Sequence, residues 1–156
     1  MPEPVGYMER TRKYYQSQGF DKPYEWATFE EVPFTPLLKP LSKSRVGLIT
    51  TAALYDREAS DPRFVDSFST STPPQRLYAN DLSWDKNATH LNDRESYLPL
   101  QGLSDAINSG LIGGITSRFH CAPTEYSTRR TLKQDAPDLL SRLQNDKADI
   151  ALLVPL

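Results

Sequence analysis

The chain has 156 residues, which is enough for one domain with a hydrophobic core, and its 18 Lys and Arg against 20 Asp and Glu give a net charge of −2. The charges form no block of one sign, which excludes the charge pattern of a nucleic-acid-binding or membrane-surface protein. No apolar run reaches the ~20 residues of a membrane span, the N-terminus has no signal-peptide pattern, and the single cysteine, Cys121, cannot form an internal disulfide, so we expect a cytoplasmic protein.

The first 42 residues are predicted to form a helix and an ordered arm. Residues at helical spacing predict a helix from Tyr7 to Gln18, with Gly19 as its cap. Prolines interrupt regular structure between Phe20 and Pro40, but the same segment is rich in large apolar side chains. Because disordered segments are poor in aromatic residues, we expect a Pro- and aromatic-rich N-terminal arm that wraps the rest of the chain.

Residues 43–156 are predicted to form the core. Arg45–Thr51 is β-branched and apolar, which indicates a strand, whereas the polar stretch from Asp56 to Pro74 indicates a long loop that is functional or disordered. The other expected elements are short strands at 76–79 and 113–120, a helix at 98–109, a helix capped by Asp135 with Leu139, Leu140 and Leu143 on its buried face, and a final strand at 148–156.

The alternation of strands and helices predicts an α/β fold, specifically a small three-layer, Rossmann-like domain with a parallel sheet. The apolar run Ile150–Val154 is typical of a strand that is covered on both faces. In parallel sheets the loops that carry ligand or catalytic groups begin at the carboxyl ends of the strands. We therefore expect residues 1–156 to form a single domain that is the N-terminal portion of a longer protein.

The two histidines stand among other reactive side chains. If their segments converge, His90, Asp93, His120 and Cys121 could form an acid/base cluster or a metal site. The alternative is that both histidines are hydrogen-bonded surface or supporting groups. No CxxC, HxH or HExxH spacing is present, so we expect no metal.

Two further patterns allow alternatives. Cys121 is either a nucleophile whose thiol pKa is lowered by its neighbours or a small apolar residue of the core. Arg129 and Arg130 either bind a carboxylate in bidentate fashion or form a solvated pair. The glycines at 110, 113 and 114 do not form a phosphate-binding loop, so no motif indicates a nucleotide.

Several segments, in this order and spacing, resemble the glycine/sarcosine/betaine reductase selenoprotein B family. The resemblance is to its short stand-alone members, which are similar to the selenoprotein subunit of D-proline reductase, and it covers most of the chain. The segments that carry it are Pro23–Trp26, Val32–Leu37, Arg45–Ala53, Trp84–Lys86, Thr89–His90, Asp93, Tyr97–Leu100, Gly110–Gly113 and Ala148–Pro155.

The resemblance implies an oxidoreductase with a disulfide as acceptor, which cleaves a C–N bond of an amino-acid-like substrate. In that family a selenocysteine or cysteine follows the strand that corresponds to Ala148–Pro155. A selenolate suits the reaction because it is ionised near neutral pH, where a thiol with a pKa of about 8.5 is mostly protonated. We therefore expect a UGA codon directly after Leu156, no cofactor bound by this chain, and no activity of the 156 residues alone.

The resemblance also implies roles for single residues. His90 would protonate the leaving amine and Asp93 would orient its imidazole. The residues expected to contact the substrate are Thr50, Thr51, Asp85, His120, Tyr126 and Arg129.

The partners expected are a pyruvoyl-type subunit, a thioredoxin-like reductase subunit, or a second copy of the chain. Two alternatives remain open at this point: a non-catalytic binding or assembly subunit, and a thiol enzyme that uses Cys121.

Overall fold

The computed structural model describes residues 6–22, 25–33, 35–58, 60–79, 87 and 90–156. The chain consists of two compact units, Met1–Phe34 and Thr35–Leu156. It has a mixed α/β fold with a five-stranded sheet, which confirms the predicted fold class. No helix among these residues is long and apolar enough to cross a membrane.

The first unit contains helix α1 (Tyr7–Ser17), which confirms the expected N-terminal helix. The helix ends where Gly19 adopts a left-handed conformation, with a φ of 83° that glycine tolerates best. Beyond the end, the ring of Phe20 meets that of Tyr15 edge-on at 5.6 Å, and the guanidinium of Arg12 lies 5.6 Å from the centre of the Trp26 ring. No residue of α1 is buried, and these aromatic contacts join the helix to the residues that follow it.

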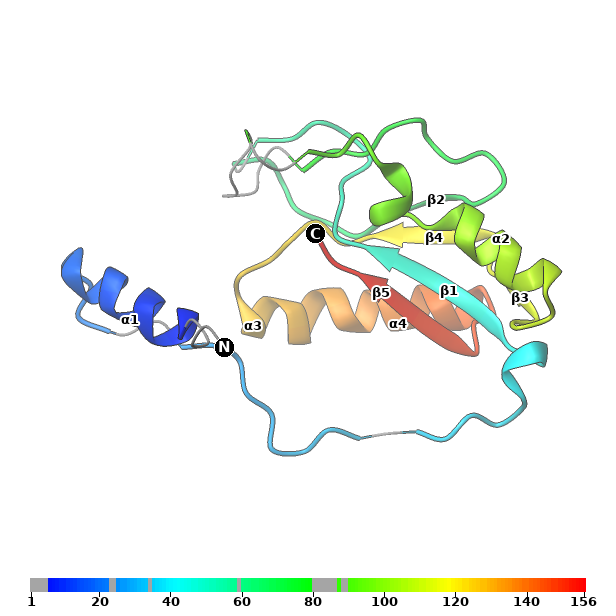
Figure 1. Cartoon of the computed structure of the whole chain (residues 1–156), viewed down its shortest axis with the longest axis horizontal. Helices are drawn as coiled ribbons and strands as arrows, with labels where there is room; N and C mark the ends of the chain where they lie inside the picture. The colour runs from blue at the N-terminus through cyan, green and yellow to red at the C-terminus, as the bar shows by residue number, and fades with distance from the viewer. Residues whose placement is uncertain (1–5, 23–24, 34, 59, 80–86, 88–89) are drawn as a thin grey trace, which may run out of the picture. The chain divides into compact units, whose positions relative to one another are not determined.

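The second unit is built around strand β1 (Arg45–Thr50) (Figure 1). One edge of β1 pairs along its length with β5 (Ile150–Val154). The other edge pairs with β3 (Gly114–Ile115) at the start of β1 and with β4 (Arg118–Cys121) at its end. These four strands are parallel, as predicted, and β2 (Asp66–Ser69) adds an antiparallel strand beside β4.

Two helices cover opposite faces of this sheet. Leu103 of helix α2 (Leu100–Asn108) packs in one apolar cluster with Leu48 and Phe119, while Leu143 of helix α4 (Ala136–Asn145) packs in a second cluster with Ile49. Neighbouring residues of a strand point to opposite faces, so Leu48 and Ile49 place the two helices on opposite sides of β1. A Cβ at Gly47 would clash with the Leu143 side chain, so this glycine allows α4 to pack close to the sheet.

The helix before β5 begins earlier than predicted. It starts with a short turn, α3 (Thr128–Arg130), and passes through a π-helical segment, η3 (Thr131–Asp135), into α4. The prediction that Asp135 caps this helix is wrong, because its carboxylate makes no capping hydrogen bond and pairs with Arg63 instead. Leu143 is buried as expected, but Leu140 is exposed.

Strand β2 lies within the polar stretch that was expected to be a loop. Its residues have no apolar alternation, and the strand forms because its backbone pairs with β4, where Phe68 lies beside Phe119 at 6.4 Å between ring centres. The expected strand at 76–79 amounts to a single bridge between Tyr78 and Ala53.

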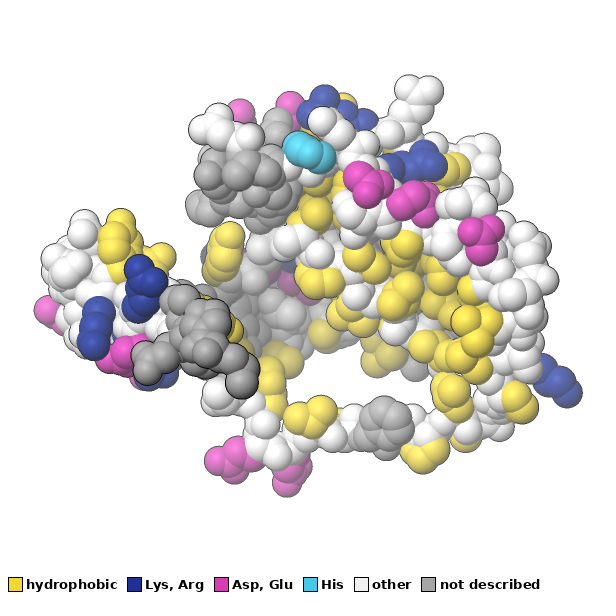
Figure 2. All heavy atoms as spheres, in the orientation of Figure 1, with side chains coloured by type: hydrophobic (Ala, Val, Ile, Leu, Met, Phe, Trp, Pro, Cys, Tyr) yellow, Lys and Arg dark blue, Asp and Glu magenta, His cyan; other side chains and the backbone are white. Residues whose placement is uncertain are grey.

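Strand β5 is at the edge of the sheet, with only β1 as its neighbour among the described strands. The prediction that both of its faces are covered is wrong for the described residues, since Leu152 and Leu153 are 36% and 66% exposed. Figure 2 shows hydrophobic side chains gathered on the face of the molecule where β5 and α2 lie. The apolar sequence of β5 therefore forms an exposed edge strand rather than a central strand of the sheet.

Candidate functional site

The topology places one crevice at the carboxyl edge of the sheet. Strands β1 and β4 are parallel neighbours, so their carboxyl ends lie side by side; after β1 the chain runs to β2, and after β4 it runs to α3 and α4. Ligands in open α/β sheets bind in the crevice outside the carboxyl ends of the strands. The segments that begin there are 51–65 after β1 and 122–127 after β4.

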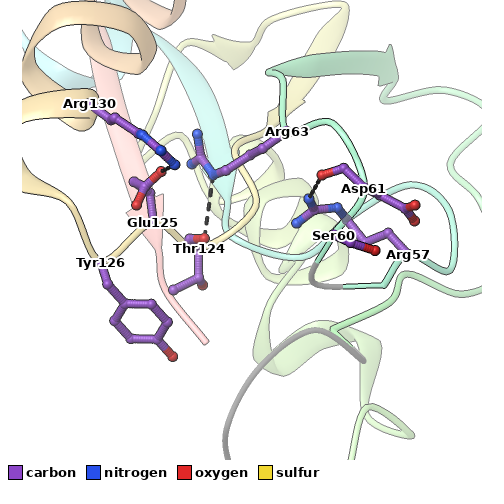
Figure 3. Close-up of a pocket in the computed structure, with 8 residues that line it drawn as sticks. All are labelled: Arg57, Ser60, Asp61, Arg63, Thr124, Glu125, Tyr126 and Arg130. Carbon is purple, nitrogen blue, oxygen red and sulfur yellow. Dashed lines mark hydrogen bonds and ion pairs between the residues drawn. The ribbon is translucent and has the colours of Figure 1, made fainter.

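A pocket of about 370 Å³ occupies this crevice (Figure 3). Arg63 lies near its centre, with the residues of the β1 segment on one side and those of the β4 segment on the other. The pocket is lined by Arg57, Ser60, Asp61, Arg63, Thr124, Glu125, Tyr126 and Arg130.

Arg63 connects the pocket to the helix before β5. Its Nη1 atom lies 2.5 Å from Oδ1 of Asp135, and its Nε donates to the carbonyl of Thr124 at 3.4 Å. The side chains of Arg63 and Asp135 are only 17% and 8% exposed, so this ion pair is weakly screened by solvent. The pair fixes the guanidinium at the pocket wall.

Arg57 and Asp61 form the opposite side of the pocket. Arg57 is buried, and its Nη2 donates to the carbonyl of Asp61 at 2.9 Å. The carboxylate of Asp61 accepts from the backbone N–H of Glu58 at 2.8 Å. These two bonds hold a compact turn that presents a second guanidinium to the pocket.

Glu125 supplies a fixed negative charge. Its Oε1 accepts from the backbone N–H of Ser127 at 2.8 Å, and its Oε2 lies 3.3 Å from Nη1 of Arg130. The hydrogen bond from Ser127 lowers the pKa of the Glu125 carboxyl, and Arg130 lowers it further against the opposing effect of burial. Glu125 is therefore ionised at neutral pH, next to the exposed ring of Tyr126.

The lining of the pocket thus combines three guanidinium groups with two carboxylates and one aromatic ring. Guanidinium groups bind carboxylates through paired hydrogen bonds, whereas carboxylates and aromatic faces attract ammonium groups. A small zwitterion, with one charge of each sign, matches this lining better than a simple anion or cation.

The expected threonines lie beside the crevice. Thr50 is fully buried, and its hydroxyl accepts from the backbone N–H of Ala52 at 3.3 Å. The hydroxyl of Thr51 accepts from the backbone N–H of Leu156 at 2.7 Å, which holds the chain after β5 against the end of β1. Of the residues expected to contact the substrate, Tyr126 lines this pocket and Arg129 does not, whereas its neighbour Arg130 does.

His120 belongs to a different, buried cluster on the α4 side of the sheet. Its Nδ1 lies 2.9 Å from the hydroxyl of Ser67, and its Nε2 lies 3.4 Å from Oδ2 of Asp146. Arg142 donates to the same hydroxyl at 2.7 Å, and Arg118 binds Asp146 through both of its forked nitrogens. Burial lowers the pKa of His120, which favours the neutral imidazole in this cluster.

His90 and Asp93, the expected acid/base pair, each accept a hydrogen bond from a nearby backbone N–H. Nδ1 of His90 accepts from the backbone N–H of Asn92 at 3.3 Å, and the carboxylate of Asp93 accepts from the backbone N–H of Glu95 at 3.1 Å. No hydrogen bond or ion pair among the described residues joins His90 to Asp93 or to His120. Asp85 lies outside the described residues.

Cys121 lies in the apolar cluster around Leu48 and is fully buried. Burial raises the pKa of its thiol to about 12, and Asp66 adds to the shift. The thiolate is therefore scarce at neutral pH, which favours the packing role of Cys121 over the nucleophile. Elsewhere in the described part of the chain, no three His, Cys, Asp or Glu side chains are grouped as metal ligands.

The residues of the pocket that were not predicted from the sequence are Arg57, Ser60, Asp61, Arg63, Thr124 and Glu125. The sequence did contain one signal, because the segment 56–74 was expected to be functional if it was not disordered. Comparisons with protein-family models, with curated proteins and with solved structures found no match to this chain.

Proposed function

We propose that this chain is the substrate-binding α/β domain of a selenoprotein-B-type reductase that acts on a small zwitterionic amino acid. The observation that carries the proposal is the pocket of mixed charge between the carboxyl ends of β1 and β4. The resemblance of the sequence to the glycine/sarcosine/betaine reductase selenoprotein B family supports the same substrate class.

In this proposal the guanidinium groups of Arg63 and Arg57 hold the carboxylate of the substrate. Glu125, ionised and fixed by Ser127, attracts the ammonium group, and the Tyr126 ring offers it an aromatic face. The two contacts fix both ends of a molecule with a single carbon between its charges. Orientation of this kind is what a reaction at that carbon requires.

The reaction proposed is reductive cleavage of the C–N bond. The bond breaks after a pyruvoyl group of a partner subunit has activated the amine, the nitrogen leaves as the protonated amine, and the carbon gains hydrogen. The two electrons come from a selenol or thiol paired with a second thiol, which end as a selenosulfide or disulfide that a thioredoxin-like subunit reduces. The resemblance places the first of these groups after β5, on the sheet edge where Leu156 binds Thr51.

The finer features predicted for the fold belong to the same proposal. They are a Rossmann-like arrangement of the three layers, an arm that wraps the core, and a cytoplasmic location. The helices on both faces of the parallel strands support the first of these.

Calorimetric titration of the 156-residue chain tests the binding step. Glycine, sarcosine, betaine and proline are compared with acetate, which has only the carboxylate, and with tetramethylammonium, which has only the cation. We expect at least one zwitterion to bind about tenfold more tightly than either half-molecule, because both charges are matched. Equal affinity for a zwitterion and for acetate would contradict the substrate class.

Two variants assign this binding to the pocket. Glu125→Gln removes the negative charge that faces the ammonium group, and it should weaken binding of the zwitterion while acetate binding is unchanged. Arg129→Gln is the matched control, since Arg129 is an exposed neighbour that does not line the pocket. An equal loss in both variants would place the ligand elsewhere.

The redox step is tested with the gene and its natural downstream DNA in a host that inserts selenocysteine. We expect mass spectrometry of the product to locate selenium directly after Leu156. A sense codon there for a residue other than cysteine, or a stop codon other than UGA, excludes the selenoprotein part of the proposal and leaves the binding part standing.

The exposed strand β5 favours a second candidate function, a non-catalytic binding or assembly subunit. Leu153 is 66% exposed and Leu152 is 36% exposed, beside a strand edge that has no partner among the described strands. Such an edge suits addition of a strand from another protein. If zwitterions bind but the gene encodes no selenium or thiol group after Leu156, this second function is the better one.

A further inference from the structure

The opposite edge of the sheet holds a second pocket, of about 260 Å³. It lies where β1 and β5 begin, whereas the pocket of mixed charge lies beyond the carboxyl ends of the strands. It is lined by Lys39, Lys43, Arg45, Gly113, Lys147 and Asp149. Four cationic side chains surround one carboxylate, so the lining has a net charge of three positive units.

The single carboxylate, that of Asp149, helps to build the pocket. Oδ2 of Asp149 accepts from Nζ of Lys39 and from the backbone N–H of Arg45, each at 2.7 Å. The backbone N–H of Asp149 in turn donates to the carbonyl of Arg45 at 2.8 Å. Lys39 and the Arg45 N–H lower the pKa of Asp149, which keeps it ionised. Asp149 therefore ties the starts of two strands together and neutralises only one of the four cations.

Gly113 and Lys43 form another part of the pocket wall. Gly113 approaches the backbone of Lys43 and Ser44 so closely that a Cβ would clash with both. Its N–H donates to the carbonyl of Ser44 at 2.9 Å. Because only glycine allows the two backbone segments to approach this closely, the position of the Lys43 backbone is set by the fold.

Lys147 enters the pocket from a strained position. It follows α4 in the left-handed conformation, with a φ of 57°, and is the only non-glycine residue with positive φ in the described part of the chain. The N–H groups of Lys147 and Ala148 donate to the carbonyls of Gln144 and Leu143, a helix-ending motif that usually has glycine at this position. A lysine here costs stability that a glycine would not, which points to a use for its side chain.

The free charge of the pocket is concentrated on a few groups. Among the described residues, Lys43 and Lys147 form no ion pair, and Arg45 meets Asp149 through its backbone. The ammonium groups and the guanidinium are exposed at the rim, so an anion would gain several charge-assisted hydrogen bonds without displacing an internal partner.

An apolar pocket of about 270 Å³ adjoins the cationic one and shares Lys39 and Asp149 with it. The apolar pocket is lined in part by Pro36, Leu37 and Leu38, and the side chain of Leu38 is entirely exposed. A ligand with an anionic head and an apolar body would contact both pockets at once. Neither pocket alone would favour such a molecule.

We propose that the amino edge of the sheet is a binding site for an organic phosphate. The phosphoryl group sits among Lys43, Arg45 and Lys147, and the apolar part of the molecule covers Leu37 and Leu38. A phosphoryl dianion matches three free cations better than a carboxylate does, because it carries more charge and three acceptor oxygens. The proposal does not depend on the function assigned to the carboxyl edge.

Phenyl phosphate is the probe, because it joins a phosphoryl dianion to an apolar ring. Its binding to the 156-residue chain is followed by ¹⁵N-resolved NMR titration at low salt, beside inorganic phosphate and phenol. We expect phenyl phosphate to bind about three- to tenfold more tightly than phosphate, with shifts at Gly113 and Lys147. Absence of phosphate binding, or shifts confined to other residues, overturns the proposal.

Lys147→Gly is the decisive variant, because it should raise the stability of the fold and weaken the binding of phenyl phosphate. Glycine relieves the left-handed strain, so the midpoint of thermal unfolding rises, while affinity for phenyl phosphate falls about three- to tenfold. Lys133→Gln removes an exposed lysine outside the pocket and is the matched control. Unchanged affinity in Lys147→Gly contradicts the role of this lysine in the site.

Leu38→Ser separates the two parts of the ligand. Because the side chain is fully exposed, the fold is not at risk. We expect the variant to bind inorganic phosphate like the unaltered chain and to lose the preference for phenyl phosphate. A retained preference would show that the apolar pocket does not take part and that the site binds the phosphoryl group only.

Discussion

The two ends of the sheet carry similar numbers of cations but use them differently. At the carboxyl edge, Arg57, Arg63 and Arg130 are each bonded to an acceptor within the protein. At the amino edge, Lys43 and Lys147 have no ion-pair partner among the described residues. The paired charges of the carboxyl-edge pocket suit a ligand that carries both a positive and a negative charge. The unpaired cations of the amino-edge pocket attract an anion. The pairing of charges within each pocket therefore determines which ligand it can bind.

The two ends also differ in what holds them. The pocket at the carboxyl edge is formed by long segments after β1 and β4, fixed by ion pairs such as the one between Arg63 and Asp135. The pocket at the amino edge is formed by backbone hydrogen bonds at the starts of strands, such as the one from Gly113 to Ser44. Removing a paired arginine at the first end should therefore lower stability, whereas removing an unpaired lysine at the second end should weaken anion binding without lowering stability.

The largest effect is expected from Arg63→Met at the carboxyl edge. The change leaves the buried carboxylate of Asp135 without its partner, and we expect it to lower the free energy of unfolding by about 3 kcal/mol. Urea unfolding measures the loss. Arg130→Met is the matched control, since the side chain of Arg130 is 63% exposed and its ion pair should contribute under about 1 kcal/mol.

A second change distinguishes an unpaired charge from lost packing. Asp135→Leu in the Arg63→Met background removes the carboxylate that has lost its partner, and most of the stability should return. If the double variant is as unstable as Arg63→Met, the contribution of Arg63 comes from its packing, and the two ends of the sheet are less different than their charges indicate.

Salt provides the next test of the comparison. Affinity for phenyl phosphate at the amino edge should fall about tenfold between 20 mM and 200 mM sodium chloride, because its cations are exposed and unpaired. Affinity for a zwitterion at the carboxyl edge should change less than about twofold, because the ligand has no net charge. Equal salt dependence at both sites would mean that internal pairing does not control selectivity.

His120, on β4, gives a smaller, pH-dependent effect in the region between the two pockets. Burial holds its pKa below the value of about 6.5 expected in the unfolded chain, so the unfolded state takes up the proton first. The stability due to the neutral imidazole is complete above that pH and is lost as the pH falls below it, with a slope of at most about 1.4 kcal/mol per pH unit.

Urea unfolding between pH 7.5 and 5.5 measures this dependence before most carboxylates titrate. In His120→Gln the slope should be reduced, because the buried imidazole is absent. A slope that persists in His120→Gln would assign the proton uptake to another group near Asp146.

The parts of the fold that were predicted from sequence are those with a strong side-chain pattern. Helices α1 and α2 and strands β1 and β5 lie where periodicity and β-branched residues placed them. Strand β2 was missed because its pairing with β4 depends on backbone hydrogen bonds and leaves no apolar alternation in Asp66–Ser69. Asp135 was misinterpreted because a residue suited to capping a helix is equally suited to an ion pair with a distant arginine.

The candidate site was predicted only in part for a similar reason. Tyr126 was named as a site residue from the family resemblance, but Arg63 and Thr124, which meet in the pocket, are 61 residues apart in sequence. Arg63 and Thr124 are in contact because strands β1 and β4 are neighbours in the sheet, and no pattern in the sequence predicts which strands are neighbours. His90 and Asp93, which are close in sequence, were expected to interact, yet each bonds to a neighbouring backbone N–H instead.

The smallest effect on stability is expected at β5, which runs from one end of the sheet to the other. Leu153→Glu places a charge on a side chain that is 66% exposed, so the free energy of unfolding should change by less than about 0.5 kcal/mol. The effect of Leu153→Glu on self-association should be much larger, because an exposed apolar edge strand pairs readily with another chain and a charge prevents this pairing.

Sedimentation velocity should show dimers or larger species for the unaltered chain and monomers for Leu153→Glu. Leu111→Glu, at an equally apolar and exposed position after α2, is the control that should leave association unchanged. An unaltered chain that stays monomeric at high concentration would contradict an association surface at β5, and the two pockets would then be the only described features that call for a partner.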